Sequence, residues 1–295
     1  MNSAVLIDKP SGMTSMDVIR KARKKANIKR IGHAGTLDPL ATGLLVLLFG
    51  KATKLQDIFQ NATKGYTGTI QLGLSTETLD VDGKEHVLKD VPSNIQNNSE
   101  VTLNLIEKFS GTYFQLPPQY SALKVSGVSS HKLARQGIEV ELKKREVTIE
   151  FKKLEFSSND ILSFDVICSK GTYIRSLARD IGVELGCGAC IKTLRRTLSS
   201  PFTLNETVSL DSFLEDDILE HLVDISKLVS HLPKIEVSPE QLRSLQFGKQ
   251  EILDQVSISS DKKLAAIFSE NSFGGLAYKK DSGEDAGAWR IKFIL

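Results

Sequence analysis

Cysteine and long hydrophobic runs are scarce in this sequence. Its 295 residues include three cysteines, an odd number that argues against a disulfide framework and for a reducing compartment. The longest apolar stretch, around residues 44–49, is far shorter than the roughly 20 residues that a membrane helix needs. The first residues also lack a secretory hydrophobic segment. We therefore expect a cytoplasmic protein without membrane partners.

The sequence also lacks complete motifs for common cofactors and metals. Residues 43–51 resemble a phosphate-binding loop, but six residues separate the glycines instead of four, and Ala52 stands where a Ser or Thr should bind magnesium. Cys187 and Cys190 form half of a zinc site that has no second pair. Residues 80–83 begin like a calcium loop that is never completed, so a turn is the better interpretation. We expect chemistry without a cofactor and without a metal.

Composition and charge indicate a folded protein with one strongly basic segment. The 40% hydrophobic and 25% charged fractions exclude a disordered chain, and the length suffices for a catalytic domain plus a small appendage. The net charge is only +2, yet seven lysines and arginines and no acid lie between Arg20 and Arg30. Such a run is most often a solvated helix face. It also suits a polyanionic partner.

The run GHAGTLDPLATG, at residues 32–43, holds one acid, one imidazole and three glycines directly before an apolar stretch. Pro39 biases Asp38 away from the helical region toward an extended backbone, and the glycines allow turns that other residues resist. This geometry presents the carboxylate instead of hiding it. Taken alone, the run favours an Asp-Pro turn between core elements, since such turns are common.

Hydrophobic periodicity predicts a mixed α/β fold of the α+β class. Alternating apolar residues indicate strands, and apolar residues three and four apart indicate helices. Thr14 and Asp17 form a capping-box start for the first helix, and a later helix turns its apolar face inward and leaves Arg175 to point elsewhere. The expected strands lie at residues 4–7, 44–49, 66–72, 147–152 and 161–168, and the expected helices at 14–26, 52–59, 101–109 and 174–185.

Two further segments differ in character from this main body. Residues 126–144 are polar and basic, which predicts a projecting insertion. A change in composition after helical material at residues 210–228 predicts a boundary between a domain at 1–230 and a small mixed domain at 231–295. Inside the small domain we expect a Ser238-Pro239 cap, a helix at 241–247 and strands at 264–268, 276–279 and 288–294.

Seven motifs occur in order along the chain: DKPSG at residues 8–12, GHAGTLDPLATG at 32–43, KGY at 64–66, YSALK at 120–124, RQGIEV at 135–140, SKGTYIR at 169–175 and LRR at 194–196. Together they resemble the bacterial TruB family, the tRNA pseudouridine synthases that act on uridine 55 of the T loop. The resemblance covers roughly residues 4–200 and rests on several ordered motifs rather than on one. It implies a pseudouridine-synthase catalytic domain with a central, mostly antiparallel sheet, residues 126–144 as a thumb-like insertion, and a small C-terminal PUA-like RNA-binding domain.

The resemblance assigns three residues to the reaction. Asp38 matches the carboxylate that forms a covalent link to the nucleotide, and the resemblance leaves open whether it attacks the sugar or the ring. Tyr66 matches the aromatic residue that stacks on the target base and assists proton removal. Arg175 matches the cation that pairs with the carboxylate and keeps it ionised. Because the reaction exchanges a C–N for a C–C glycosidic bond without redox change, it needs no cofactor.

Four more residues match positions that bind the substrate. Tyr173, Lys9 and Leu194 match pocket-lining positions, where Lys9 and Leu194 can equally be structural. His33 matches the residue that fills the gap left when a base leaves its stack, an extrusion that costs a few kcal/mol. A hydrogen-bonded loop histidine is an equal alternative for His33.

The implied partner is the T stem-loop of tRNA, bound by a protein that acts as a monomer without guide RNA. A non-catalytic RNA-binding or tRNA-folding module is the alternative function, and a guide-RNA-dependent enzyme is disfavoured by the thumb-like insertion. The chain departs from the family pattern at residues 76–80, which are less acidic than in relatives, and at Cys190, where a histidine is frequent.

Overall fold

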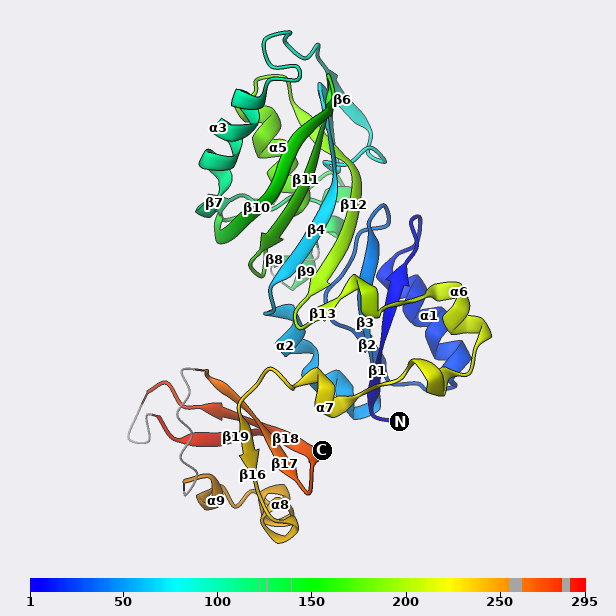
Figure 1. The fold of residues 1–295 in the computed structure, drawn as a ribbon, viewed down its shortest axis with the longest axis vertical. Helices are drawn as coiled ribbons and strands as arrows, with labels where there is room; N and C mark the ends of the chain where they lie inside the picture. The colour runs from blue at the N-terminus through cyan, green and yellow to red at the C-terminus, as the bar shows by residue number, and fades with distance from the viewer. Residues whose placement is uncertain (122, 126, 139, 255–261, 283–286) are drawn as a thin grey trace.

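The computed structural model describes residues 1–295 except 122, 126, 139, 255–261 and 283–286. A large, twisted sheet of eleven strands dominates it (Figure 1). Its strands are β1 (Ser3–Lys9), β2 (Ile31–His33), β3 (Thr42–Phe49), β4 (Lys64–Leu72), β7 (Gly111–Gln115), β10 (Arg145–Ser158), β11 (Ile161–Cys168), β12 (Ala189–Ser199), β13 (Phe202–Thr203), β14 (Val208–Ser209) and β15 (Val223–Asp224).

The main path of this sheet runs β14-β1-β3-β12-β4-β11-β10-β7. Along it β1 pairs with β14 and β3 with β12 in parallel, and the other neighbours are antiparallel. The parallel β3–β12 pairing joins the first part of the chain to a strand about 150 residues later and brings residues 42–43 beside 195–196. The predicted mostly antiparallel sheet of an α+β protein is confirmed.

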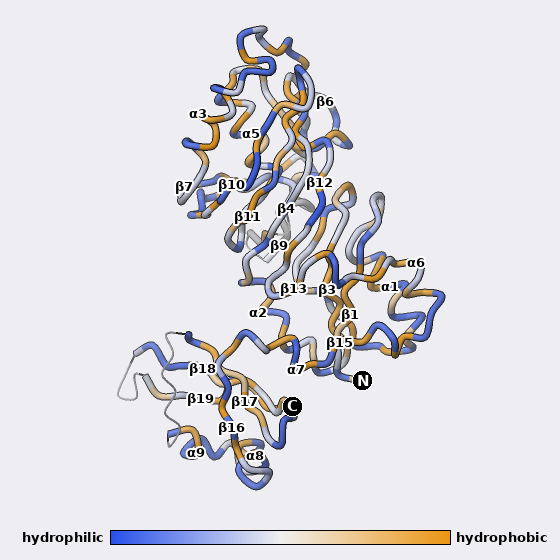
Figure 2. Tube along the Cα trace, in the orientation of Figure 1, coloured by the Kyte–Doolittle hydropathy of each residue, from blue (hydrophilic) through white to orange (hydrophobic). Residues whose placement is uncertain are grey.

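Strand β3 lies between β1 and β12 in the sheet and is buried on both faces. Leu45, Leu47 and Phe49 belong to one hydrophobic core, and Leu44 and Val46 to another. Because side chains alternate across a strand, a strand with two covered faces reads as a continuous apolar run, which is how residues 44–49 appeared in the sequence. Figure 2 shows the same concentration of apolar residues along β1 and β3.

Helix α1 (Ser15–Ala26) covers one face of β3. Thr14 caps it and forms the predicted capping box with Asp17, and Val18, Ile19 and Ala22 are buried. The basic residues point outward, as expected for an amphipathic helix. Other helical segments are η1 (Gly50–Leu55), α2 (Gln56–Gln60), α3 (Ser99–Phe109), α5 (Ile174–Glu184), η2 (Leu204–Glu206), α6 (Leu210–Glu215), η3 (Ile218–His221) and α7 (Ile225–Leu228).

Residues 210–228 are less helical than the sequence predicts. The short strand β15 lies between η3 and α7 and pairs with β1 at Ser3 and Ala4, so an available sheet edge overrides the local helical pattern. Among the described residues, no helix is both long and apolar enough to cross a membrane. Two small hairpin pairs also lie outside the main sheet, β5 (Leu74–Thr76) with β6 (Glu85–Leu88), and β8 (Lys124–Val125) with β9 (Val128–Ser129).

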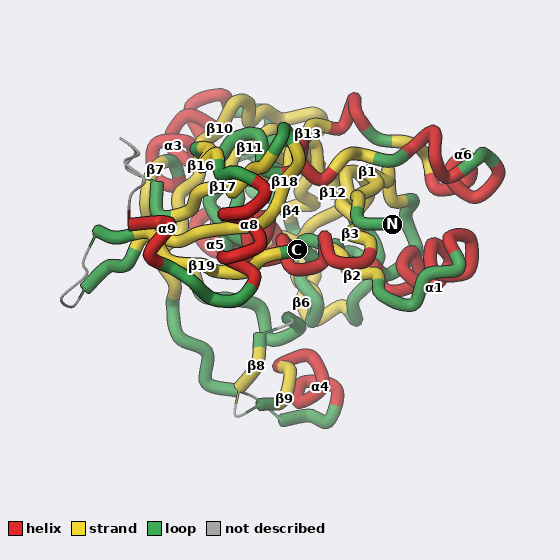
Figure 3. The backbone as a smooth tube through the Cα atoms, turned by 90° about the horizontal axis from the view of Figure 1, so that it is seen from below, coloured by secondary structure: helices red, strands yellow, loops and turns green. Residues whose placement is uncertain are grey.

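The segment predicted to project, residues 126–144, contains β9 and α4 (Ser130–Arg135), and β8 lies directly before it. Figure 3 shows these elements apart from the sheets, joined to them by long connections. Residues 126 and 139 of this segment lie outside the described part of the chain. Its role as a thumb stays a prediction.

A second, four-stranded sheet follows the main body in the order β16-β17-β18-β19. Ser238 caps its helix α8, and Pro239 occupies the first turn, as predicted. Phe268 and Leu276 share a core with Leu44 of β3, so this sheet packs on the main body; the exact domain boundary near residue 230 stays a prediction. The elements are β16 (Lys234–Glu236), α8 (Pro239–Gln246), α9 (Glu251–Asp254), β17 (Leu264–Ser269), β18 (Ser272–Lys279) and β19 (Trp289–Ile294).

Gly43 allows β3 and β12 to approach closely. Its φ is +97°, and a Cβ there would lie 2.4 Å from the Arg196 carbonyl oxygen. We expect Gly43→Ala to lower the free energy of unfolding by about 1–3 kcal/mol more than Gly186→Ala does. Gly186 is the matched control because its φ of +73° carries similar strain while no atom lies within 4 Å. Urea unfolding measures both; equal losses would show that strain alone decides.

Candidate active site

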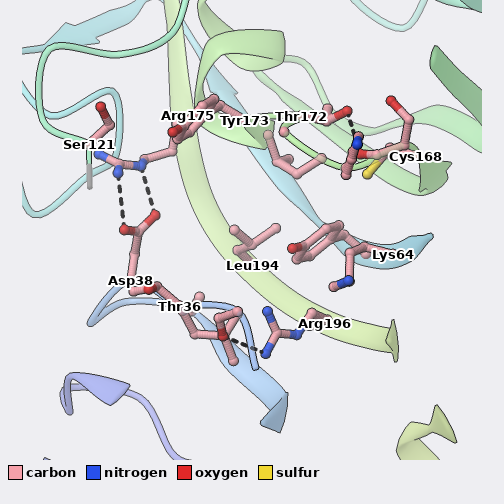
Figure 4. A pocket seen from close by; sticks show the side chains of 18 of the residues that line it. Thr36, Asp38, Lys64, Ser121, Cys168, Thr172, Tyr173, Arg175, Leu194 and Arg196 are labelled. Carbon is pink, nitrogen blue, oxygen red and sulfur yellow. Dashed lines mark hydrogen bonds and ion pairs between the residues drawn. The ribbon is translucent and has the colours of Figure 1, made fainter. Parts of the chain in front are cut away.

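A pocket of about 360 Å³ opens where the Asp38 loop, β4, β12 and the start of α5 meet. Its size falls within the range of about 300–1,000 Å³ that is usual for small-molecule sites. Figure 4 shows Asp38 on one side of it, Arg175 facing Asp38, and Leu194 between them and Lys64. Five of the seven predicted site residues line this pocket: Asp38, Tyr66, Tyr173, Arg175 and Leu194.

Asp38 and Arg175 form a two-pronged ion pair across the pocket. The Nη2 atom of Arg175 lies 3.0 Å from Oδ1 of Asp38, and Nε lies 2.9 Å from Oδ2 (Figure 4). The Asp38 side chain is 38% exposed, whereas that of Arg175 is 8% exposed. Paired bonds of this kind fix orientation as well as charge. The carboxylate is thus ionic, aimed and open to a ligand.

Arg175 is held by backbone groups from two distant segments. Its Nη1 donates to the Thr78 carbonyl at 2.6 Å, and its Nη2 donates to the Tyr120 carbonyl at 2.9 Å. A second carboxylate, that of Asp80, lies 3.8 Å from Nη1 and is largely buried. Burial raises the pKa of Asp80, against the opposing effects of the Thr78 hydrogen bond and the Arg175 charge.

The walls of the pocket are aromatic and apolar. Tyr66 lies on β4, and burial raises the pKa of its phenol. Tyr173 precedes α5, and burial raises its pKa as well, so both phenols are neutral at pH 7. Leu194 on β12 lies opposite Gly68 of β4. Such walls suit a flat ring, because an aromatic face and an aliphatic side chain can cover both of its sides.

Lys9 and His33 lie near the pocket but do not line it. The Lys9 ammonium donates to the carbonyls of Pro10, Met13 and Pro39, at 2.9, 2.6 and 3.2 Å, so it supports the loop directly after Asp38. His33 ends β2, and burial and then the charge of Arg196 lower its pKa. Its Nδ1 is buried, and no residue in the described part of the chain forms a hydrogen bond with it. Lys9 therefore holds the loop, and the role of His33 stays a prediction.

Lys9 leads to a pH-dependent prediction. Burial lowers its pKa from 10.5 to about 8, so between these values the unfolded chain binds more protons than the folded chain. The free energy of unfolding then rises with pH by at most about 1.4 kcal/mol per pH unit in this range. Below about pH 8 the destabilisation caused by burying the Lys9 charge has its full size. We expect Lys9→Met to reduce that slope. Urea unfolding between about pH 7.5 and 9.5 measures it, and an unchanged slope would contradict the prediction.

Three charged residues were missed by the sequence analysis as parts of the site. Lys64 and Arg196 line the pocket, and Asp80 contacts Arg175. Strand periodicity contains a signal for the first two, because Lys64 shares a face with Tyr66, and Arg196 with Leu194. Burial lowers the pKa of Lys64 to about 8. Asp80 gave no such signal, since its partner lies almost a hundred residues away.

Metal-ligating residues gather away from this pocket. Among the described residues, Asp216, Glu220 and His221 are the one group whose ligand atoms lie within 4.8 Å of one another. Nε2 of His221 is 2.9 Å from Oδ2 of Asp216, so a hydrogen bond accounts for the proximity of these two side chains. Cys187 and Cys190 are both buried and do not belong to that group.

Two solved structures of other proteins share this fold. A structure described as "Structure of H/ACA RNP bound to a substrate RNA containing 2'-deoxyuridine" aligns with a TM-score of 0.70 and 22% identity, over 99% of this chain and 84% of that one. A "Crystal Structure of a Cbf5-Nop10-Gar1 Complex" gives a TM-score of 0.70 at 24% identity, with the same coverage of both chains. These likenesses show the fold.

Sequence comparison then identifies the family. The model of the TruB family pseudouridylate synthase N-terminal domain matches residues 23–174, and that of the tRNA pseudouridylate synthase B C-terminal domain matches 175–235. Proteins called tRNA pseudouridine synthase B are similar over most of their length: 40% identity in Syntrophotalea carbinolica over 88% of this chain and 85% of that protein, and 38% in Clostridium perfringens over 96% and 97%. The chain belongs to the TruB family of pseudouridylate synthases. It is an isomerase, which confirms the predicted enzyme over a non-catalytic RNA-binding module.

Proposed function

We propose that this enzyme converts uridine 55 in the T loop of tRNA into pseudouridine, with Asp38 as the nucleophile. The observation that carries the proposal is the aimed, partly exposed Asp38 carboxylate, held by Arg175 inside a pocket with aromatic walls. In the reaction the bond between N1 of uracil and C1′ of the ribose breaks, and a bond between C5 and C1′ forms. C5 loses a proton and N1 gains one, so the product is an isomer and no co-reactant is consumed.

A carboxylate nucleophile divides this exchange into two easier steps. Asp38 forms a bond to the nucleotide, the uracil ring turns, and the new C–C bond releases the carboxylate in its original form. Arg175 balances the carboxylate charge before attack and after release. Tyr66 covers one face of the ring, and its phenol lies in the same pocket as Asp38. It assists removal of the C5 proton as a relay, in which the phenol oxygen takes that proton as its own hydroxyl proton passes on toward N1.

The target base must leave its stack to reach the pocket. Enzymes that act on a base in a folded nucleic acid extrude it at a cost of a few kcal/mol. The projecting segment with β8, β9 and α4 is suited to close on the loop, and His33 to occupy the vacated place. The exposed basic face of α1 supplies positive charge for phosphate contacts. We propose the T stem-loop of tRNA as the partner, bound by a monomer in the cytoplasm.

Unmodified tRNA incubated with the purified protein alone tests this function. Carbodiimide treatment and primer extension should give one new stop at uridine 55, and a transcript with cytidine at that position should give none. Absence of any stop would refute the activity, and a stop elsewhere would refute the proposed site. A requirement for added guide RNA would refute the proposed independence from it.

A further inference from the structure

Arg196 is among the largest fully buried side chains of the described residues, and it is 1% exposed. An arginine stays charged at all ordinary pH values, and burying a charge is costly unless it is well paired and hydrogen-bonded. No carboxylate pairs with Arg196 among the residues the structure describes. Arg196 lies on β12 and contributes to the pocket lining. Neutralisation of a carboxylate therefore does not explain why a charged side chain is buried here.

The guanidinium bonds to both ends of the loop that carries Asp38. Its Nε donates to the Leu44 carbonyl at 2.7 Å, and its Nη2 donates to the Gly35 carbonyl at 3.2 Å. Gly35 precedes Asp38 by three residues, and Leu44 follows it by six. Gly43 also sits against the Arg196 backbone. The guanidinium of this one side chain thus fixes both ends of the Asp38 loop to β12.

The same side chain also neighbours Tyr66 across the sheet. Arg196 and Tyr66 are directly opposite in the antiparallel pairing of β12 with β4, and both line the pocket. The charge of Arg196 opposes the effect of burial, which raises the pKa of the Tyr66 phenol. The hydrogen-bond acceptors of Arg196 are therefore two neutral carbonyl oxygens of the Asp38 loop, and Tyr66 is its neighbour on the adjacent strand.

We propose that Arg196 is a positioning residue that fixes the Asp38 carboxylate and the Tyr66 phenol relative to each other, so that both address one base. The inference rests on the proposed function, because it assigns Asp38 and Tyr66 their roles. A lysine cannot replace this fork, since its single ammonium does not match two acceptors on opposite ends of a loop in the same geometry. Misplacement of a reacting group by about 1 Å can cost about 10²-fold in rate.

Single-turnover pseudouridine formation tests the proposal with Arg196→Lys and Arg196→Gln, each in the natural background and with Tyr66→Phe. We expect Arg196→Lys to slow the reaction by about 10- to 100-fold, while the tRNA Kd changes by less than about threefold. The double variant should be within about threefold of the slower single variant, because residues that act as a unit are not additive. Arg195→Gln, on the opposite face of β12, is the matched control and should keep the natural rate.

Each other outcome would overturn the proposal. Full activity of Arg196→Lys would remove the need for the fork, and losses that multiply with Tyr66→Phe would show independent action. A weaker tRNA Kd with an unchanged rate would make Arg196 a binding residue. Failure of both Arg196 variants to fold, when Arg195→Gln folds, would make it purely structural. If the natural protein itself forms no pseudouridine 55, the proposed function falls instead.

Discussion

Asp38→Asn should abolish pseudouridine formation, with a loss of at least about 10⁴-fold in the single-turnover rate. The amide has nearly the shape of the carboxylate but is a far weaker nucleophile. It also keeps one oxygen to accept a bond from Arg175, so the pocket should stay folded. The tRNA Kd should therefore change by less than about threefold. Tritium release from 5-[³H]-uridine tRNA measures the rate, and filter binding measures the affinity.

Asp8→Asn is the matched control for this variant. Asp8 also pairs with an arginine, with its Oδ2 2.6 Å from Nη2 of Arg195, but it does not line the pocket. Its replacement removes a carboxylate–guanidinium pair without touching the proposed chemistry, so the rate should stay within about threefold of the natural value. An Asp38→Asn variant that keeps a tenth or more of the natural rate would exclude Asp38 as the nucleophile.

The sequence predicted the strongly patterned parts of the fold well. Three local signals are found in the structure at the predicted positions: the capping box at Thr14, the buried run at residues 44–49 and the Ser238 cap. The sequence missed the short strand β15 within the otherwise largely helical residues 210–228, where Val223 pairs with Ala4. Such a pairing depends on a distant edge strand, which no local pattern contains.

The site shows the same division between local and distant information. The Asp-Pro turn suggested from local rules that Asp38 would be presented, and helix periodicity placed Arg175 off the apolar face of α5. The sheet order brings Asp38 close to Arg175, because β3, which follows the Asp38 loop, lies beside β12, and α5 packs against β12. The contact of Arg175 with Asp80 likewise depends on this tertiary arrangement. Motif resemblance supplied the pairing of Asp38 with Arg175. It supplied no reason to expect Arg196 to bond to the same loop.

Arg175→Met should damage both stability and catalysis. Removing one partner of a buried charged group typically costs about 3–5 kcal/mol, because the remaining charge stays buried without compensation. Here that group is Asp80, 8% exposed, while the Thr78 and Tyr120 carbonyls lose a donor. The rate of pseudouridine formation should also fall by about 10²- to 10³-fold, since Asp38 loses the two bonds that aim it. Arg179→Met, one turn along α5 and bonded to its neighbour Asp180, should have little effect on the rate.

The pH dependence separates the two consequences of Arg175→Met. The pKa of Asp80 is raised by burial and lowered by the Arg175 charge, so loss of Arg175 raises it further. A carboxyl group whose pKa is higher in the folded than in the unfolded state binds more protons when folded. Its contribution to stability therefore falls as the pH rises from the unfolded-state pKa to the folded-state pKa. The stability difference between natural protein and variant should thus be larger at pH 7 than below about pH 5.

Urea unfolding at both pH values measures this difference. Adding Asp80→Asn to Arg175→Met should restore part of the lost stability but none of the lost rate. A loss of stability that is the same at both pH values would show that the missing backbone contacts, and not the unpaired Asp80 charge, determine the cost.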